Sequence, residues 1–451
     1  MNTLNVMKQN TSCCTPAKSI EIQQINPNAN KNLPVVIIGA GPIGLAAAAH
    51  LVAQKQAFIV LEAGHEIAHN MRSWGHVTLF SPWRYNINKA AKALLETSDW
   101  VEPNLDTLPT GNELIDLYLK PLAELVQIKP NIQLNAKVVG ISRQFNDKMK
   151  TKNRLEQPFT IYVERENDIH IIAARAVIDA TGTWGNPNPA NTTGVWLQNE
   201  KALTNHIEYG IPDINSNAKR YANKKIAVIG GGHSAINTLL TLAALQEDNP
   251  ATKLVWIMRK KSVEEAYGGE EKDALAARGA LGIRIHELVE TGKVEVVTPF
   301  YISQLRQDEN IQIIGTINGE TKVLTGFEEL IVNAGNRPDF TINSELRLSI
   351  DAATESVQAL APLIDPNEHS CGTVRAHGEE ILRQPEKDFY IVGAKSYGRA
   401  PTFLMATGYE QVRSITAYLC GDTEASKRVE LALPETGVCS AQLGQPSNTC
   451  C

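Results

Sequence analysis

A glycine-rich turn between two apolar strands, within residues 35–62, strongly limits what this chain can fold into. Four valines and isoleucines precede the sequence GAGPIG at residues 39–44, and an alanine-rich segment then leads to a second apolar run that ends before Glu62. In such a strand–turn–helix–strand unit, glycines permit a tight turn and close approach of a pyrophosphate to the helix N-terminus, while the final acid binds a ribose. We therefore predict a dinucleotide site that contains Gly39, Gly41, Gly44 and Glu62.

A second turn of the same type follows an apolar strand and reads GGGHSA at residues 230–235, with alanine in place of the third glycine. The next strand ends at Met258, and three basic residues rather than an acid follow it. A carboxylate there would repel the 2′-phosphate of NADPH, whereas a guanidinium or ammonium group would bind it. The alternative is a solvated basic turn. The predicted NADPH-binding residues are Gly230, Gly232, Ser234, Ala235, Arg259 and Lys260.

Two further segments are typical of the places where such nucleotide-binding domains close. ATG at residues 180–182 follows one strand, and NAGNRP at residues 333–338 follows another. A last strand at residues 388–392 precedes a helix predicted over about residues 401–419, whose N-terminal dipole would favour negative charge on a bound flavin. We predict that an FAD site also contains Val138, Thr181, Gly182, Gly393 and Thr402.

The order of these segments predicts an α/β protein with two Rossmann-like dinucleotide-binding domains, in which the FAD domain is interrupted by the NADPH domain. A chain of 451 residues is long enough for two or three domains. The predicted divisions are a disordered polar tail (1–32), the FAD domain in two parts (33–215 and 336–425), the NADPH domain (222–335) and a cysteine-containing tail (426–451). This arrangement implies hydride transfer from nicotinamide to flavin.

The loop at residues 64–83 is rich in aromatic and basic side chains, and we expect it to pass close to the flavin ring. Arg72 and Trp74 are therefore included in the cofactor-binding set and as candidates for catalysis. The alternative is that the tryptophans of this loop only pack the domain. Cys371, in a Ser-Cys-Gly turn, is the third catalytic candidate, or else a buried structural cysteine.

Seven cysteines bear on where electrons go after the flavin. Residues 62–179 and 230–335 contain none, which excludes a redox dithiol in the two places where disulfide reductases of this architecture carry one. One hypothesis is oxygen, which a reduced flavin converts to a peroxyflavin that oxidises sulfur, nitrogen or trivalent arsenic. The second is a metal, metalloid or thiol reductase, and the third is a thiol-based metalloid-binding protein with a non-catalytic flavin fold. The last two would use soft thiolates in the tails, at Cys13, Cys14, Cys450 and Cys451.

The net charge is −6, from 43 basic and 49 acidic residues, and it predicts neither nucleic acid nor an anionic membrane as a partner. Residues 1–32 contain no apolar signal segment, so a cytoplasmic location is expected. Residues 33–53 lack Asp, Glu, Lys and Arg, but their glycine turn indicates a buried strand and helix rather than a membrane span. The expected partner is a small-molecule or metalloid substrate, and the sequence leaves a homo-oligomer open.

Four stretches carry a resemblance that covers about residues 34–439. They read HIEYGIPD at 206–213, GHSA at 232–235, HSCGTVR at 369–375 and KSYGRAPTF at 395–403. The chain resembles the flavin-dependent monooxygenase superfamily, and within it the flavin-binding monooxygenases encoded in bacterial arsenic-resistance clusters. The resemblance implies an FAD-dependent, NADPH-consuming monooxygenase. One departure is the superfamily motif FxGxxxH, which would end at His206 but has Glu200 and Ala202 in place of Phe and Gly.

Overall fold

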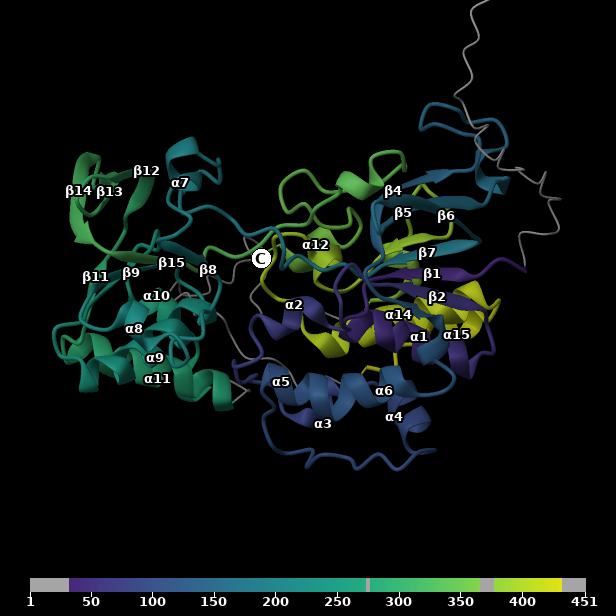
Figure 1. The fold of residues 1–451 in the computed structure, drawn as a ribbon, viewed down its shortest axis with the longest axis horizontal. Coiled ribbons are helices and arrows are strands. Elements are labelled where there is room, and N and C mark those ends of the chain that lie inside the picture. Colours follow the sequence, from purple (N-terminus) through teal and green to yellow (C-terminus); the bar gives the residue numbers. More distant parts are fainter. Residues whose placement is uncertain (1–31, 273–275, 366–376, 432–451) are drawn as a thin grey trace, which may run out of the picture.

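The computed structural model describes residues 32–272, 276–365 and 377–431, which Figure 1 shows as two units side by side. One unit contains a five-stranded sheet in the order β16-β7-β1-β2-β3, and the other a five-stranded sheet in the order β11-β10-β9-β15-β8. The strands of both sheets pair in parallel. The predicted α/β class with two Rossmann-like units is confirmed.

The first sheet combines strands from distant parts of the chain. β1 (Val35–Ile38) lies between β2 and β7, and all four of its residues are buried, as expected for a β-branched strand covered on both faces. The other strands are β2 (Phe58–Leu61), β3 (Ile132–Gln133), β7 (Ala176–Asp179) and β16 (Phe389–Ile391). Because β16 follows the whole second unit in sequence, the second unit is an insertion into the first.

Helices α1 (Pro42–Ala53) and α14 (Met405–Leu419) pack together below this sheet in the view of Figure 1. Helix α1 begins with proline at its first position, where no N–H is needed, and its alanines allow close packing. Helix α14 begins at Met405, later than the predicted start near residues 401–402. The reason is that Leu404 is still extended, with φ −118° and ψ 146°.

All strands of the second sheet come from one continuous part of the chain, although smaller elements lie between them in sequence. They are β8 (Ile207–Tyr209), β9 (Lys225–Ile229), β10 (Lys253–Ile257), β11 (Val294–Val297) and β15 (Glu329–Val332). Helices α9 (His233–Asp248) and α11 (Ala276–Glu290) lie below it in Figure 1. Strand β8 precedes residue 222, the predicted start of the NADPH domain, yet it pairs with β15 and so belongs to the second sheet.

Each unit also carries a three-stranded antiparallel sheet. In the first unit it contains β4 (Lys137–Arg143), β5 (Phe159–Arg165) and β6 (Asp168–Ala174), and in the second β12 (Tyr301–Gln307), β13 (Ile311–Ile317) and β14 (Glu320–Phe327). The short helices are α2 (His69–Arg72), α3 (Trp83–Asn86), α4 (Lys89–Leu95), α5 (Gly111–Leu114), α6 (Lys120–Glu124), α7 (Gln198–Lys201), α8 (Ala218–Tyr221), α10 (Glu264–Tyr267), α12 (Ala361–Ile364), α13 (Glu379–Leu382) and α15 (Thr423–Lys427). Tighter or wider helical turns occupy 115–119, 129–131, 154–156, 270–272, 341–343 and 393–397.

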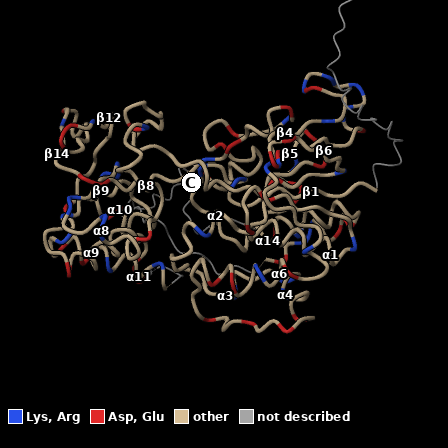
Figure 2. The backbone as a smooth tube through the Cα atoms, in the orientation of Figure 1, with Lys and Arg blue, Asp and Glu red and all other residues tan. Residues whose placement is uncertain are grey.

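Acidic and basic residues are interspersed along the backbone of both units, as the colours in Figure 2 show. Among the described residues, no helix is long and apolar enough to cross a membrane. Most of the two predicted tails lies outside the described residues, and so do the cysteines considered for catalysis or metalloid binding, namely Cys13, Cys14, Cys371, Cys450 and Cys451.

Candidate functional site

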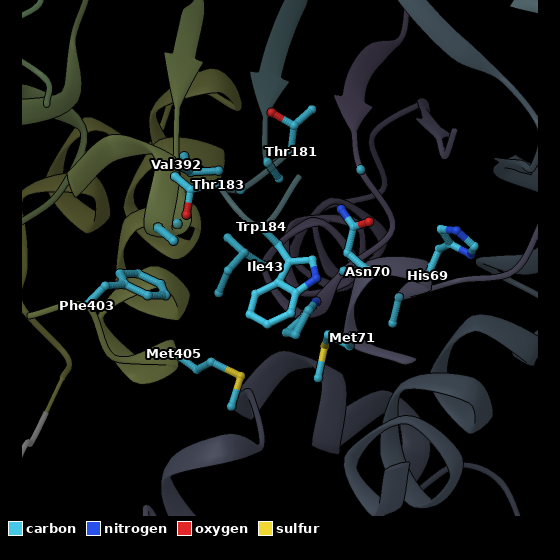
Figure 3. Close-up of a pocket in the computed structure, with 18 of the residues that line it drawn as sticks. Ile43, His69, Asn70, Met71, Thr181, Thr183, Trp184, Val392, Phe403 and Met405 are labelled. Carbon is cyan, nitrogen blue, oxygen red and sulfur yellow. The ribbon is translucent and has the colours of Figure 1, made fainter. Parts of the chain in front are cut away.

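A cavity of about 500 Å³ lies at the carboxyl ends of β1, β2, β7 and β16 in the first unit, and Figure 3 shows part of its lining. This is the edge of a parallel sheet at which α/β proteins bind ligands. Seven of the predicted site residues line it: Gly39, Gly41, Glu62, Trp74, Thr181, Gly182 and Gly393. The structure therefore brings together residues from the first glycine turn, from the ATG segment at 180–182 and from the turn after β16.

The first glycine turn leaves backbone open toward this cavity. Gly39 has φ +101°, and a Cβ built on it would lie 2.8 Å from the carbonyl oxygen of Ala180. A Cβ on Gly44 would lie only 1.9 Å from the Gly39 carbonyl oxygen, so this residue lets α1 start close to β1. Gly41, by contrast, faces open space. The turn thus has the tight first and third positions, and the accessible second position, that a pyrophosphate requires.

Glu62 holds the edge of the cavity through two backbone hydrogen bonds. Its Oε2 accepts from the N–H of Ala40 at 2.8 Å, and its Oε1 accepts from the N–H of Gly64 at 2.8 Å. Each carboxylate oxygen has two acceptor sites, so each retains capacity for a further donor. The carboxylate is therefore fixed in position at the cavity and can still accept hydrogen bonds from ribose hydroxyls.

A buried ion pair joins the end of β7 to the segment that follows β16. Lys395 Nζ lies 2.7 Å from Asp179 Oδ2, and both side chains are about fully buried. Lys395 also donates to Thr181 Oγ1 at 3.1 Å, while Asp179 Oδ1 accepts from the Thr181 hydroxyl at 2.7 Å. Asn343 donates to Asp179 as well, at 3.1 Å. The network fixes the turn that contains Thr181 against the segment that begins at Gly393.

Aromatic and thioether side chains form a wall of the cavity that the sequence analysis missed. Trp184 lies in the middle of the close-up in Figure 3, with Met71, Met405 and Phe403 around it. Its ring centroid is 6.1 Å from that of Trp74. Two sequence signals were available, because Trp184 follows the ATG segment closely, and Phe403 and Met405 adjoin the predicted Thr402.

Four residues predicted for the FAD site do not line the cavity, namely Gly44 (described above), Arg72, Val138 and Thr402. Arg72 forms ion pairs with Asp116 at 2.8 Å and Glu66 at 3.4 Å, and the hydrogen bond from Arg72 to Asp116 raises the pKa of the guanidinium. Val138 is buried within β4. Thr402 precedes the lining residue Phe403, and its Oγ1 is buried without a hydrogen-bond partner.

The second glycine turn has the same construction as the first. Gly230 has φ +136°, and a Cβ on it would lie 2.3 Å from the carbonyl oxygen of Asn333, in the segment that follows β15. Gly232 faces open space. Arg259 is exposed just after β10, and the ammonium group of Lys260 donates to the Glu265 carbonyl oxygen at 2.7 Å. Ser234 and Ala235 belong to the first turn of α9.

Phe80 lies between the cavity of the first unit and the helix that follows the second glycine turn. Its side chain lines the cavity of the first unit, yet its ring centroid lies 5.9 Å from that of His233, the first residue of α9. The guanidinium carbon of Arg278, a buried residue of α11, also lies 5.9 Å from the Phe80 ring centroid. The start of the second turn's helix is therefore adjacent to the cavity.

The lining and size of the cavity are suited to FAD. It has the apolar lining, the few placed polar groups and the size that are usual for cofactor sites. Accessible backbone at Gly41 and Gly182 suits phosphates, and Glu62 suits a ribose. Two buried side-chain atoms without a hydrogen-bond partner, Thr402 Oγ1 and His76 Nε2, belong to residues close to the lining in sequence, but neither residue lines the cavity.

Comparison with known proteins gives relatives of this architecture. The chain is 26% identical over 311 residues to a ferredoxin–NADP reductase of Lactiplantibacillus plantarum, covering 67% of this chain and 72% of that protein. The bacillithiol disulfide reductase Bdr (YpdA) of Bacillus cereus superposes with a TM-score of 0.63 at 17% identity, covering 86% of this chain and 99% of that one. DfoA, a cadaverine monooxygenase of Erwinia amylovora, gives 0.61 at 12%, covering 90% and 99%.

The two solved structures share the fold, and they include both a disulfide reductase and a flavin monooxygenase. A family model described as pyridine nucleotide-disulphide oxidoreductase matches residues 36–370, which span both glycine turns and the cavity wall between them. The chain is therefore an oxidoreductase and belongs to the pyridine nucleotide-disulphide oxidoreductase family.

Proposed function

We propose that this protein is an FAD-dependent, NADPH-consuming monooxygenase that oxidises a soft heteroatom, namely sulfur, nitrogen or trivalent arsenic, in a small substrate. In the balanced reaction, NADPH, O₂, a proton and the substrate give NADP⁺, water and the oxygenated substrate. The observation that carries the proposal is the composition of the cavity. Its lining joins the FAD-type glycine turn to an aromatic and thioether wall, and none of the lining residues that the structure describes is a cysteine.

The chain's own groups would bind and orient the two cofactors, FAD and NADPH. The flavin, when bound, supplies hydride acceptance and oxygen chemistry, and the protein supplies geometry and electrostatics. The N–H groups at the start of α1 face phosphate, and the Glu62 carboxylate accepts from ribose. In the second unit, the turn before α9 receives the NADPH pyrophosphate, while Arg259 and Lys260 bind the 2′-phosphate.

Exclusion of water supports oxygenation over simple reduction of oxygen. Trp184, Phe403 and Met405 cover the cavity with apolar surface, so a substrate held there displaces solvent. The indole of Trp184 also rests on the second unit, since a Cβ on Gly210 would lie 2.9 Å from it. A small neutral substrate suits these walls better than a charged one, because a charge would be desolvated without a partner.

The test compares NADPH oxidation, O₂ consumption and H₂O₂ release with and without a thioether, an amine or arsenite. A true substrate should increase NADPH oxidation in the presence of oxygen, lower the H₂O₂ released per NADPH, and appear as an oxygenated product. Trp184→Ala should restore H₂O₂ release even when substrate is present, because removal of the indole opens the apolar wall of the cavity to water. Trp196→Ala is the matched control, since Trp196 packs on Tyr209, 5.4 Å between ring centroids, and does not line the cavity.

A second candidate is transfer of electrons from NADPH to an external acceptor, and one observation favours it. The relative from Lactiplantibacillus plantarum is a ferredoxin–NADP reductase and aligns with 67% of this chain. The same assay separates the two candidates when it is run without oxygen. Rapid reduction of a one-electron carrier or of a disulfide, with no oxygenated product from any substrate in air, would replace the monooxygenase proposal by this one.

A further inference from the structure

We propose that His65, Glu66 and His69 bind a late divalent transition-metal ion such as Zn²⁺ beside the cavity. One ligand atom of each residue lies within 4.8 Å of the other two. His65 Nε2 is 3.9 Å from Glu66 Oε1, and the two imidazole centroids are 4.9 Å apart. The argument for this site does not rest on the proposed function, because none of the three residues belongs to a glycine turn.

The ligand set indicates the class of metal. Neutral imidazoles suit Zn²⁺, Ni²⁺, Co²⁺ and Cu²⁺, whereas Ca²⁺ and Mg²⁺ prefer oxygen ligands throughout. Bonds of about 2.0–2.2 Å place the ligand atoms of a tetrahedral ion about 3.3–3.6 Å apart, so these atoms, now within 4.8 Å of one another, must draw together by up to about 1.5 Å. The His65 side chain is 71% exposed and is free to make that movement. Three protein ligands leave at least one position for water or another ligand.

The backbone holds two of the ligands close together without a helix between them. The Gly64 N–H is bound to Glu62, and the Ala68 N–H donates to the Ala40 carbonyl oxygen at 3.0 Å. Ala68 has φ 53° and ψ 29°, an uncommon left-handed conformation for a residue with a side chain, and it turns the chain back before His69. A Cβ on Gly64 would lie 2.4 Å from the His69 ring, so this imidazole rests directly on the Gly64 backbone.

Glu66 can be released to the metal at little cost. Within the described part of the chain, Glu66 pairs with one guanidinium, that of Arg72, whose Nε lies 3.4 Å from Oε2. Arg72 keeps stronger partners, since it donates to Asp116 at 2.8 Å and to Asn112 at 3.0 Å. Half-exposed ion pairs of this length contribute little to stability, so losing the Arg72–Glu66 contact costs little free energy compared with what metal ligation would contribute.

A metal at this site would restrict the segment that lines the cavity. His69, Asn70 and Met71 all line it, and Figure 3 shows His69 at the side of the cavity away from Phe403. Cross-linking His65 to His69 would fix the start of α2 relative to Glu62. Metal occupancy and ligand affinity in the cavity are therefore expected to be coupled.

The test is titration of the FAD-containing full chain with Zn²⁺ by calorimetry and with Co²⁺ by absorption. The tail cysteines would compete for these ions if they act as soft ligands, but thiolates give Co²⁺ an intense near-ultraviolet charge-transfer band that imidazole and carboxylate ligands lack. We expect one ion per chain bound without that band after Cys13, Cys14, Cys450 and Cys451 are replaced by serine. His65→Gln, Glu66→Gln and His69→Gln should each weaken this binding by about tenfold or more.

His170→Gln is the control, because His170 is an exposed histidine on β6 and should leave the affinity unchanged. The single variant His65→Gln alters a mostly exposed side chain, so a folding defect would not obscure the result. Unchanged Zn²⁺ affinity in this variant, or Co²⁺ binding with thiolate bands only, would overturn the proposal. Neither outcome depends on NADPH oxidation, so the proposed function is tested separately.

Discussion

Arg259 is expected to determine the choice between NADPH and NADH. It is exposed just after β10, beyond the second glycine turn, and we expect its guanidinium to pair with the 2′-phosphate that NADH lacks. Arg259→Gln should raise KM for NADPH by roughly 10- to 100-fold, the equivalent of one hydrogen bond to a charged group, and leave KM for NADH nearly unchanged. Steady-state kinetics with each nucleotide measure both values.

The control for this prediction is Lys261→Gln, which removes an exposed positive charge two residues away. It should change KM for NADPH much less than Arg259→Gln does. Equal increases in KM for both nucleotides in Arg259→Gln would mean that the residue supports the turn rather than binding the phosphate.

The imidazole of His50, near the end of α1, is held in its neutral form. Burial, and then the charge of nearby Arg413, lowers the pKa of His50 from 6.5 to about 4. The contacts of Asn88 give a structural reason for the lowered pKa of His50. Its Oδ1 accepts from the N–H groups of Ala90 and Ala91 at 3.0 and 3.1 Å, which directs its Nδ2 toward His50 Nε2 at 3.2 Å. This ring nitrogen must then accept, and a proton on it would face a second donor.

The folded state therefore binds fewer protons than the unfolded state between pH of about 4 and 6.5, and the free energy of unfolding falls as pH falls through this window. The loss assigned to His50 is on the order of 1–3 kcal/mol. His50→Gln should flatten this dependence, and His170→Gln should not. Urea unfolding at several pH values gives the comparison, and an unchanged slope in His50→Gln would refute the assignment.

At the scale of elements, the Asp179–Lys395 ion pair connects the end of β7 to the segment after β16. Lys395→Met leaves the Asp179 carboxylate buried without its cation, so the free energy of unfolding should fall by about 3–5 kcal/mol. The double variant Asp179→Asn with Lys395→Met should lose less than the sum of the single variants, because no charge is left buried. Chemical denaturation of the four proteins gives this cycle.

Lys387→Met is the control for the ion pair, because Lys387 is an exposed lysine before β16 and should change stability by no more than about 0.5 kcal/mol. Additive effects of the two single variants would show that the side chains act independently. Loss of FAD from Lys395→Met at unchanged stability would instead assign the lysine to ligand binding.

Local pattern was sufficient to predict both glycine turns and the strands beside them. The residues at 39–44 and 230–235 lie where the sequence predicted them, because the requirements for a tight turn are local. The aromatic wall was not predictable in the same way. Trp184 and Met405 come together only because the fold of the sheet places β7 and α14 near each other. Arg72 does not line the cavity because it binds Asp116, which lies 44 positions later in the chain.

At the scale of the whole molecule, the hydrophobic cores of the two units are separate. One cluster of buried residues contains only positions between 35 and 180 or beyond 340, and the two others contain only positions between 190 and 332. The chain crosses between the units twice, and the two crossings run side by side. The N–H of Asn188 donates to the Gly335 carbonyl oxygen at 2.9 Å, and that of Arg337 to the Asn186 carbonyl oxygen at 2.9 Å.

This arrangement predicts that residues 187–338 fold alone. The fragment keeps all five strands of the second sheet and both of its apolar clusters, and at about 150 residues it can bury enough surface for an independent domain. We expect cooperative thermal unfolding, binding of NADP⁺ by calorimetry, and no binding of FAD.

The matched control is the fragment 222–335, which starts where the sequence alone predicted the NADPH domain. It lacks β8, which pairs with β15 at the sheet edge, and it lacks Ala190, Leu203 and Ile207 from one apolar cluster. Its Tm should therefore be clearly lower than that of 187–338, or it should not fold. If 187–338 unfolds without cooperativity, then contacts across the units, such as Trp184 with Gly210 and Phe80 with His233, are required for the second unit to fold. If both fragments have the same Tm, β8 is an accessory strand and the unit begins near residue 222.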